Sequence, residues 1–383
     1  MTYSETRTKK IYIKEGKNMK RIFALVLCIV MALSVVACGT TPAETTPNAG
    51  NTETPATEAE YKLGMGIVVS TGSSKTGNAQ VDATVATVVT DANGKIVLCR
   101  IDVAQNKMNV ADGAVEADKA FETKMELGDR YNMAKYGSDN NGDGIVLEWY
   151  AQTKLFEEYV VGKTAAEVKA IETQFVNNHY IAVDETLLTA GCTMQITDFM
   201  EAVAKACEDA QGMTFKTAAT FTLGVAAKTT AEESTAATAE AAGSVKMYSD
   251  FAASVVVDGK IIAALNDAIQ PQIAINAAGE IGEVTYKGTK RELKEDYNMA
   301  KYGSSMDWNG DGKVLEWYLQ SEAFSKFVVG MTKAEVEAMS TKEAGDHIIS
   351  ADDTLLSAGC TIQITDFKAA VVKACMDEFK VSF

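Results

Sequence analysis

The segment TLLTAGCTMQITDF, residues 186–199, returns as TLLSAGCTIQITDF at residues 354–367, with only two of its fourteen positions altered. The segments NGDG, LEWY and VVG also return 168 residues later, and YNMAKYGS returns 166 residues later. A repeat of this length indicates duplicated whole domains, because solenoid units are only about 20–50 residues long. We therefore predict two tandem homologous domains, residues 61–211 and 212–383.

Each repeat carries β-type patterns first and helical patterns afterwards. Apolar runs of β-type composition, the first rich in Val and Thr, are joined by Asn-Gly or Asp-Gly turns and predict hairpins at residues 81–103 and 252–265. Apolar residues at helical spacing predict helices at 147–161 and 197–207. The capping box Thr164–Glu167, repeated as Thr332–Glu335, predicts the start of another helix in each repeat. This order predicts an α+β fold in which each domain is an antiparallel sheet followed by packed helices.

The N-terminal residues have the pattern of a secretory signal peptide. Lys20 and Arg21 precede the apolar run 22–36, which is too short for a comfortable membrane span. Met19 is the natural start of this pattern, so residues 1–18 are interpreted as an upstream extension of the reading frame.

The residue after the apolar run and its small residues is Cys38, which resembles the cysteine of a bacterial lipobox. The resemblance implies removal of residues 1–37 and a lipid anchor on Cys38, at the extracytoplasmic face of the bacterial cell membrane. Residues 38–60 are mostly Thr, Pro, Ala, Asn and Glu, which predicts a disordered tether. The alternative is an ordinary signal peptide with an incidental cysteine.

Charge and histidine content argue against two functional classes. The formal net charge of the chain is −16 at pH 7, whereas nucleic-acid binding needs a basic patch, so no nucleic-acid partner is expected. His179 and His347 stand at equivalent positions, and no nucleophile–base–acid set assembles around either. We therefore expect a chain without a catalytic constellation of its own rather than an enzyme.

The cysteines are predicted to be free thiols. Five of them follow Cys38, an odd number that cannot pair completely within the chain. Cys192 and Cys207 are separated by a predicted helix, which places them on the order of 20 Å apart at ~1.5 Å per residue. A disulfide needs Cα atoms within about 7 Å of each other.

The repeated Gly-Cys-Thr lies just before the last predicted helix of each domain. Thr197 is a good N-cap for the helix in the first domain. Thr193 would then lie near free backbone N–H groups and the positive end of the helix dipole, which favour a phosphate. Gly191 permits the tight turn that this position needs. A hydroxyl there could bind a phosphate or carry one covalently.

The run from Ala190 to Thr193, followed by Phe199, Ala202 and Val203 at helical spacing, resembles the signature of the extracytoplasmic FMN-binding domain family. In that family a Ser-Gly-Ala-Thr motif bears FMN on its threonine through a phosphoester, attached by a flavin transferase. The β-first, helix-last order and the lipid anchor are also similar to this family.

The resemblance implies a flavoprotein that carries electrons outside the cytoplasm, with a membrane reductase as its partner. It implies three cofactor-binding residues in each repeat: Gly191, Cys192, Thr193, Gly359, Cys360 and Thr361. The chain departs from the motif, with Ala190 in place of Ser and Leu187 in place of an acidic residue, and the second repeat shares both changes. The alternative is a structural turn in which the threonine only caps backbone groups.

A second repeated pattern is D-x-N-x-D-G, the first half of a calcium-binding loop. The bidentate Glu expected at loop position twelve is replaced by Tyr150 and Tyr318, so a glutamate two positions earlier would have to substitute. The candidate calcium ligands are Asp139, Asn141, Asp143, Glu148, Asp307, Asn309, Asp311 and Glu316. The alternative is a polar turn whose side chains cap the backbone.

The expected function is that of a membrane-anchored surface lipoprotein that binds FMN and transfers electrons. A non-redox protein of the same fold, which binds a ligand, calcium or a partner protein, is the alternative.

Overall fold

The computed structural model describes residues 58–303 and 307–383, and Ala56–Phe383 form one compact unit. The predicted signal peptide, Cys38 and residues 38–57 of the predicted tether lie outside the described residues. Within the described ranges, none of the helices combines the length and hydrophobicity needed to cross a membrane.

Two four-stranded antiparallel sheets form the centre of this unit, one for each repeat. The first sheet has the order β3-β2-β1-β6 and the second has the order β10-β9-β7-β15. The strands of the first sheet are β1 (Ala59–Ser70), β2 (Asn78–Asp91), β3 (Ile96–Asn109) and β6 (Met213–Thr217). Those of the second are β7 (Thr222–Thr230), β9 (Tyr248–Val257), β10 (Lys260–Ile269) and β15 (Lys380–Ser382). The predicted domain boundary after Gln211 assigns β6 to the second domain, whereas β6 pairs with β1 in the first sheet.

Each repeat adds short helices and a small hairpin, again in the same order. The first repeat contains α2 (Lys124–Leu127), η3 (Gly128–Tyr131), α3 (Met133–Tyr136), α4 (Trp149–Val160), α5 (Ala165–Lys169), β4 (Thr173–Val176), β5 (His179–Ala182), α6 (Glu185–Ala190) and α7 (Thr197–Glu208). The second contains α8 (Lys290–Leu293), η4 (Lys294–Tyr297), α9 (Met299–Tyr302), α10 (Trp317–Phe327), α11 (Lys333–Glu337), β13 (Thr341–Ala344), β14 (His347–Ser350), α12 (Asp353–Ser357) and α13 (Thr365–Ala374). The predicted α+β fold is confirmed, as are the capping boxes at Thr164 and Thr332.

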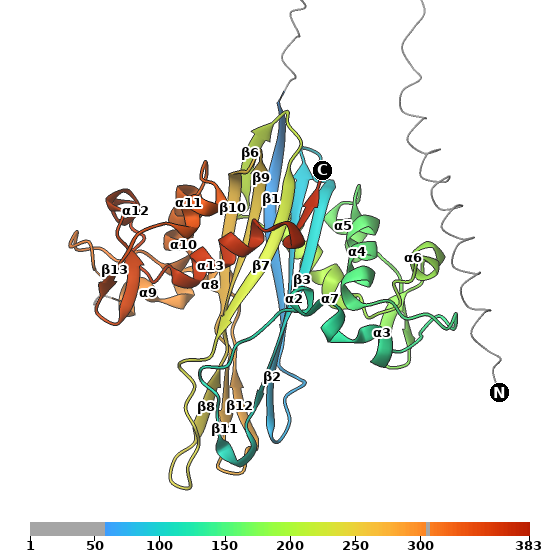
Figure 1. Cartoon of the computed structure of the whole chain (residues 1–383), viewed down its shortest axis with the longest axis horizontal. Helices are drawn as coiled ribbons and strands as arrows, with labels where there is room; N and C mark the ends of the chain where they lie inside the picture. Colours follow the sequence, from blue (N-terminus) through green and yellow to red (C-terminus); the bar gives the residue numbers. More distant parts are fainter. Residues whose placement is uncertain (1–57, 304–306) are drawn as a thin grey trace, which may run out of the picture. The chain divides into compact units, whose positions relative to one another are not determined.

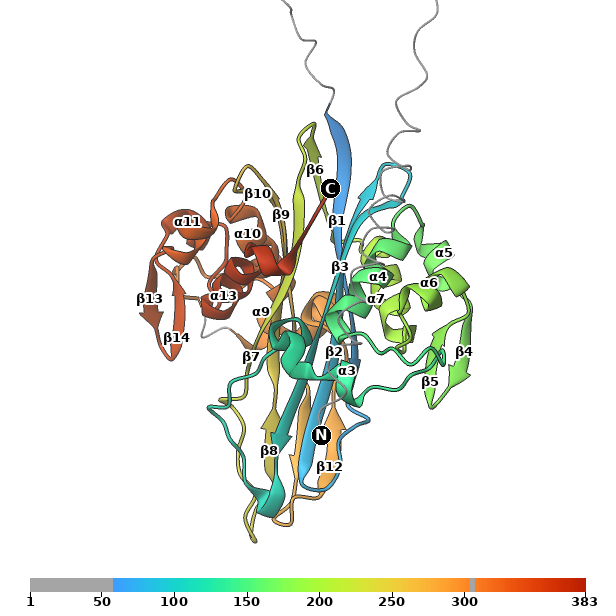
Figure 2. The same ribbon diagram turned by 45° about the vertical axis from the view of Figure 1, so that its right-hand side comes forward.

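The described unit has four layers, because each sheet is buried on both faces. In Figures 1 and 2 the two sheets lie in the middle, with the helices of the first repeat (green) on one side and those of the second (orange and red) on the other. Side chains alternate between layers along a strand, as the pleat requires. On β2, Val81 and Val85 point into a core shared by both sheets, while Ala86 and Val88 pack beneath the helices.

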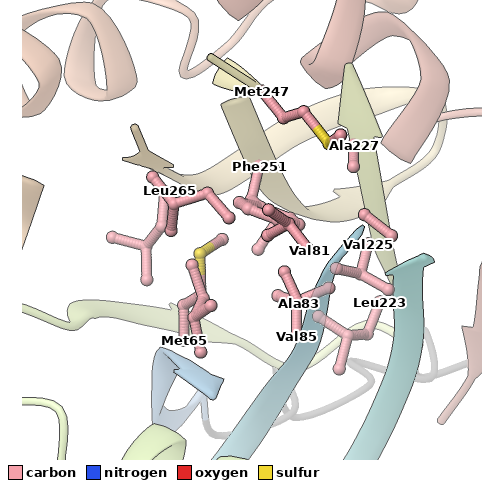
Figure 3. Packing of buried hydrophobic residues seen from close by; sticks show 14 of the residues in the cluster. Met65, Val81, Ala83, Val85, Leu223, Val225, Ala227, Met247, Phe251 and Leu265 are labelled. Carbon is pink, nitrogen blue, oxygen red and sulfur yellow. The ribbon is translucent and has the colours of Figure 1, made fainter. Parts of the chain in front are cut away.

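The shared core contains residues from both repeats. Figure 3 shows Met65 and Val85 of the first sheet packed with Val225, Phe251 and Leu265 of the second. Separating the sheets would expose these apolar side chains to water, at a cost of about 25 cal/mol per Å² of apolar area. The repeats therefore fold as one body with a common interior.

A third, three-stranded sheet extends the long hairpin of the second repeat. It consists of β8 (Gly243–Lys246), β11 (Gln272–Ile275) and β12 (Ile281–Thr285). In the first repeat the corresponding strands, β2 and β3, continue without a break. Pro271 explains the difference, because proline has no N–H to donate and β10 ends just before it.

The two repeats are also joined by reciprocal ion pairs. Lys205 on α7 contacts Glu292 at 2.5 Å, and its counterpart Lys373 on α13 contacts Glu126 at 2.6 Å. A buried pair crosses the same boundary, since Arg291 lies 3.1 Å from Asp209. These contacts add charged and polar bonds between the two repeats to the apolar core that the repeats share.

The last helix of each repeat packs so closely on its sheet that only glycine fits beneath it. A Cβ added to Gly64 on β1 would collide with the carbonyl oxygen of Ala206, and one on Gly224 of β7 would collide with that of Ala374. We predict that Gly64→Ala destabilises the protein by about 1–3 kcal/mol, measured by urea unfolding, because the helix must move away from the sheet.

The control for this prediction is Gly72→Ala, where the nearest atom, Ser70 Oγ, lies 3.8 Å from the added Cβ. Equal stability of the Gly64 and Gly72 variants would contradict the close packing described here.

The buried pair of Arg100 and Glu157 makes stability depend on pH. The two side chains are 7% and 3% exposed and lie 3.2 Å apart. Burial raises the pKa of Glu157 from 4.5 to about 7, although Arg100 opposes the shift. Between these values the folded protein holds a proton that the unfolded chain releases, so stability falls as the pH rises.

We predict that the free energy of unfolding of the wild type contains a fall of on the order of 3 kcal/mol between pH 4.5 and about 7 that is due to Glu157. This fall should be absent in Glu157→Gln, measured by urea unfolding across the same pH range. The exposed neighbour Glu158, changed to Gln, is the matched control and should keep the wild-type slope. A Glu157→Gln slope equal to that of the control would show that Glu157 ionises normally in the fold.

Candidate functional site

The repeated Ala-Gly-Cys-Thr leads into a turn just before the last helix of each repeat, as predicted, and a short helix that was not predicted, α6 or α12, precedes the turn. Gly191 is the C-cap of α6 with a φ of 106°, and Gly359, one residue beyond the C-cap Ala358 of α12, has a φ of 88°. A Cβ on Gly191 would lie 2.7 Å from Leu147 Cδ1, so both the backbone angle and the space require glycine. The glycines therefore shape the turn and bring the following threonine to a fixed place.

The threonine after each turn is held by a buried glutamine. The backbone N–H groups of Thr193 and Met194 donate to Gln152 Oε1, at 2.9 and 3.0 Å. In the second repeat, Thr361 and Ile362 donate to Gln320 Oε1, at 2.8 and 3.0 Å. One side-chain oxygen thus satisfies two buried N–H groups in each repeat.

The two threonine hydroxyls differ. Both side chains turn inward, and both residues are only 1% exposed. Thr361 Oγ1 donates to Gln320 Oε1 at 3.4 Å. Thr193 Oγ1 is buried without a hydrogen-bond partner among the described residues. A buried hydroxyl of this kind is costly unless another group bonds to it.

The cysteines and the helix entry differ from what the motif suggested. Cys192 and Cys360 are fully buried in the helix-covered cores, and burial raises the pKa of each thiol to about 12. They are inert core residues here and line neither cavity described below. The prediction that Thr197 is the N-cap was wrong, because α7 begins at this residue and Ile196, which occupies the cap position, makes no side-chain capping bond. All five described cysteines are free, as predicted.

The candidate calcium ligands bond to the backbone. Asp139 accepts from the N–H groups of Gly142 and Gly144, and Asp307 does the same in the second loop with Asp311 and Gly312. The carboxylates of Asp143 and Asp311 accept from the N–H two residues later.

The two glutamates predicted as calcium ligands also accept hydrogen bonds from the backbone. Glu148 Oε2 accepts from the N–H of Met133 at the start of α3, and Glu316 accepts from Met299 at the start of α9. Among the described residues, no group of three or more His, Cys, Asp or Glu side chains is placed to hold a metal ion. The bonds observed are those of a capped polar turn, and calcium binding stays a prediction.

The fold brings the two repeated motifs together. Asn140 Nδ2 donates to the carbonyl oxygen of Thr193 at 2.8 Å. Asn141 Nδ2 donates to that of Leu188 at 3.1 Å, and Asn309 makes the equivalent bond to Leu356. The polar loop therefore braces the segment that carries the threonine.

A cavity lies beside this segment in each repeat, and equivalent residues line both. The first cavity, of about 510 Å³, is lined by Thr193 together with Lys124, Tyr131, Trp149, His179 and Asp198. The second cavity, of about 430 Å³, is lined by the counterparts Lys290, Tyr297, Trp317, His347 and Asp366, but not by Thr361. Both volumes suit a small organic ligand.

A lysine stands over aromatic rings in each cavity. Lys124 Nζ lies 4.8 Å from the ring centre of Tyr131 and 5.6 Å from that of Trp149. Lys290 Nζ lies 4.6 Å from Tyr297 and 5.3 Å from Trp317, the equivalent rings. The ring faces attract the cations, which places a positive charge against an aromatic wall in both repeats.

The cavities differ on one strand. Strand registers pair Ser70 with Asp82 in the first repeat, and the equivalent Thr230 with Tyr248 in the second. Two residues further on, Thr84 corresponds to Asp250. The second cavity therefore has the ring of Tyr248 where the first has Asp82, and it has the carboxyl group of Asp250 where the first has Thr84.

Sequence reasoning did not find the lysines or the glutamines. The signal that could have found them is their presence in repeated segments: TKMEL and TKREL hold the lysines, and the glutamines follow LEWY by two residues in both repeats. Trp149 and Trp317 also belong to the repeated LEWY segments, and both are buried and line the cavities.

Comparisons with known proteins give one partial relative. A chlorophenol reductase of Desulfitobacterium hafniense is 36% identical over 100 residues, which cover 22% of this chain and 28% of that protein. The match thus spans less than a third of the relative's length. No protein-family model matches the chain, and no solved structure does.

The glutamine clamp gives a local prediction. In Gln152→Ala, the N–H groups of Thr193 and Met194 lose their acceptor, and each unsatisfied buried group costs about 1–3 kcal/mol. We predict that amide exchange of peptides covering residues 190–196 becomes roughly tenfold faster or more, measured by mass spectrometry.

The second repeat is the internal control, because Gln320 still binds the amides of Thr361 and Ile362 in the same molecule. Unchanged protection of residues 190–196 in the variant would mean that the clamp does not hold the segment.

Proposed function

We propose that this chain is a membrane-anchored surface lipoprotein that carries electrons with an FMN group attached to Thr193. The observation that carries the proposal is the unpartnered, buried Thr193 Oγ1 on the wall of the first cavity. A phosphoester at that oxygen would place the rest of the group in a cavity of about 510 Å³.

The residues of the first cavity fit such a group. Trp149 and Tyr131 offer aromatic surface to a flat ring system. Lys124, held over both rings, supplies positive charge for a phosphate or for a ring that gains electrons. Bound FMN would supply reversible electron transfer, while the chain would fix its position and tune its surroundings.

The two repeats support the proposal unequally. Thr361 already bonds to Gln320 and does not line the second cavity, so the proposal assigns one flavin to the chain and not two. Thr193 is 1% exposed, so a flavin transferase would have to act on it before the segment closes or while it is open.

Two further features are consistent with the proposal. The lipobox-like Cys38 would hold the carrier near a membrane reductase, which could supply its electrons. The partial relative is named as a reductase, so it too belongs to redox chemistry.

The test is to produce the mature chain with and without a flavin transferase and to look for covalent flavin. We expect ultraviolet fluorescence that survives a denaturing gel in the wild type and in Thr361→Ala. It should be absent from Thr193→Ala, because that variant lacks the acceptor oxygen. Peptide mass spectrometry then locates the modified residue.

Flavin on Thr361, or fluorescence that remains in Thr193→Ala, would contradict the assignment of Thr193. Protein from its native host with no added mass would refute the electron-carrier function itself.

A further inference from the structure

The second cavity contains a buried carboxyl group that the proposed function does not use. Asp250 is 2% exposed, lines this cavity, and its Oδ1 atom has no hydrogen-bond partner among the described residues. The equivalent residue in the first repeat is Thr84. Since burying a carboxyl without a partner is costly, a ligand that bonds to Asp250 would be strongly preferred over an empty site.

A buried lysine lines the same cavity. Lys290 is 5% exposed and donates to Tyr248 Oη at 2.9 Å, and an ammonium group has three donors. Burial lowers its pKa to about 8, against the attraction of Asp250, while burial raises the pKa of Asp250 well above its usual range. The site therefore combines a hydrogen-bond donor with a carboxyl group that either accepts or donates.

The remaining walls indicate the shape of a ligand. The rings of Tyr248, Tyr297 and Trp317 surround Lys290, and Phe367 and Ile362 add apolar surface. Such walls favour a flat aromatic molecule, which can stack on them or meet their edges. A cavity of about 430 Å³ has room for one or two fused rings.

The charges that line the second cavity disfavour anions. Five carboxyl groups line it, against the two lysines Lys246 and Lys290; they are Glu232, Glu233, Asp250, Asp346 and Asp366. The first cavity has only Asp82 and Asp198 against Lys124. The excess of acidic groups disfavours a phosphate or a carboxylate, and the buried Lys290 disfavours a cation beside it, which leaves a neutral ligand as the better fit.

We propose that the second cavity binds a neutral, flat hydroxyaromatic molecule of the phenol class. One hydroxyl group meets both polar requirements, because it donates to Asp250 and accepts from Lys290 while its ring lies against the aromatic walls. This site is separate from Thr193 and does not depend on the flavin. The second repeat would thus be a ligand-binding module on the same fold.

The experiment is calorimetry on the mature chain produced without a flavin transferase, so that its result is independent of flavin attachment. The probes are 2-naphthol, 2-methoxynaphthalene, which cannot donate a hydrogen bond, and anionic 2-naphthoate. We expect 2-naphthol to bind roughly tenfold or more tightly than either of the others, because only it can donate to Asp250 without bringing a negative charge.

Two variants assign the binding to the second cavity. Asp250→Thr introduces the residue of the first repeat, and Lys290→Met removes the donor; each should weaken 2-naphthol binding roughly tenfold or more. Lys124→Met is the matched control in the first cavity and should leave binding unchanged. Thermal unfolding checks that each variant is folded.

The proposal is overturned if wild-type protein does not bind 2-naphthol, or if 2-methoxynaphthalene binds equally well. It is also overturned if Lys124→Met weakens binding as much as Lys290→Met does, since the probe would then occupy the first cavity.

Discussion

The structure depends on the apolar core that the two sheets share. Val81 and Val85 of one repeat and Val225 and Phe251 of the other face the same interior, so neither sheet is complete without its partner. The helices then cover only the outer face of each sheet. This arrangement places the two cavities on opposite sides of a rigid double sheet, where each is built almost wholly from its own repeat.

Within a repeat, the cavity is organised by side chains that bond to the backbone. Gln152 clamps the amides after the turn, Asn140 and Asn141 brace the carbonyls around it, and Glu148 caps α3 on the other wall. Equivalent residues make most of these bonds in the second repeat, so the two cavities share one framework. The two repeats differ in the side chains that face the cavities, above all at Thr84, which corresponds to Asp250 in the second repeat.

Much of the framework could be predicted from the sequence. Local patterns decide the hairpins, the capping boxes and the helix after the turn, because the responsible bonds join residues a few positions apart. The shared core could not be predicted, since strands such as β9 are apolar on both faces and do not reveal what covers each face. The roles of Gln152 and Glu148 also depend on partners 41 and 15 residues away, which spacing in the sequence does not encode.

The reciprocal contacts Lys205–Glu292 and Lys373–Glu126 have an evolutionary consequence. A chain with a single repeat would carry both members of this pair and the same apolar sheet face, so it is equipped to form an isologous homodimer. In such a dimer every substitution appears in both pockets at once. Fusion into one polypeptide removes that constraint, and it allows one half to keep an ancestral binding chemistry while the other acquires a new one.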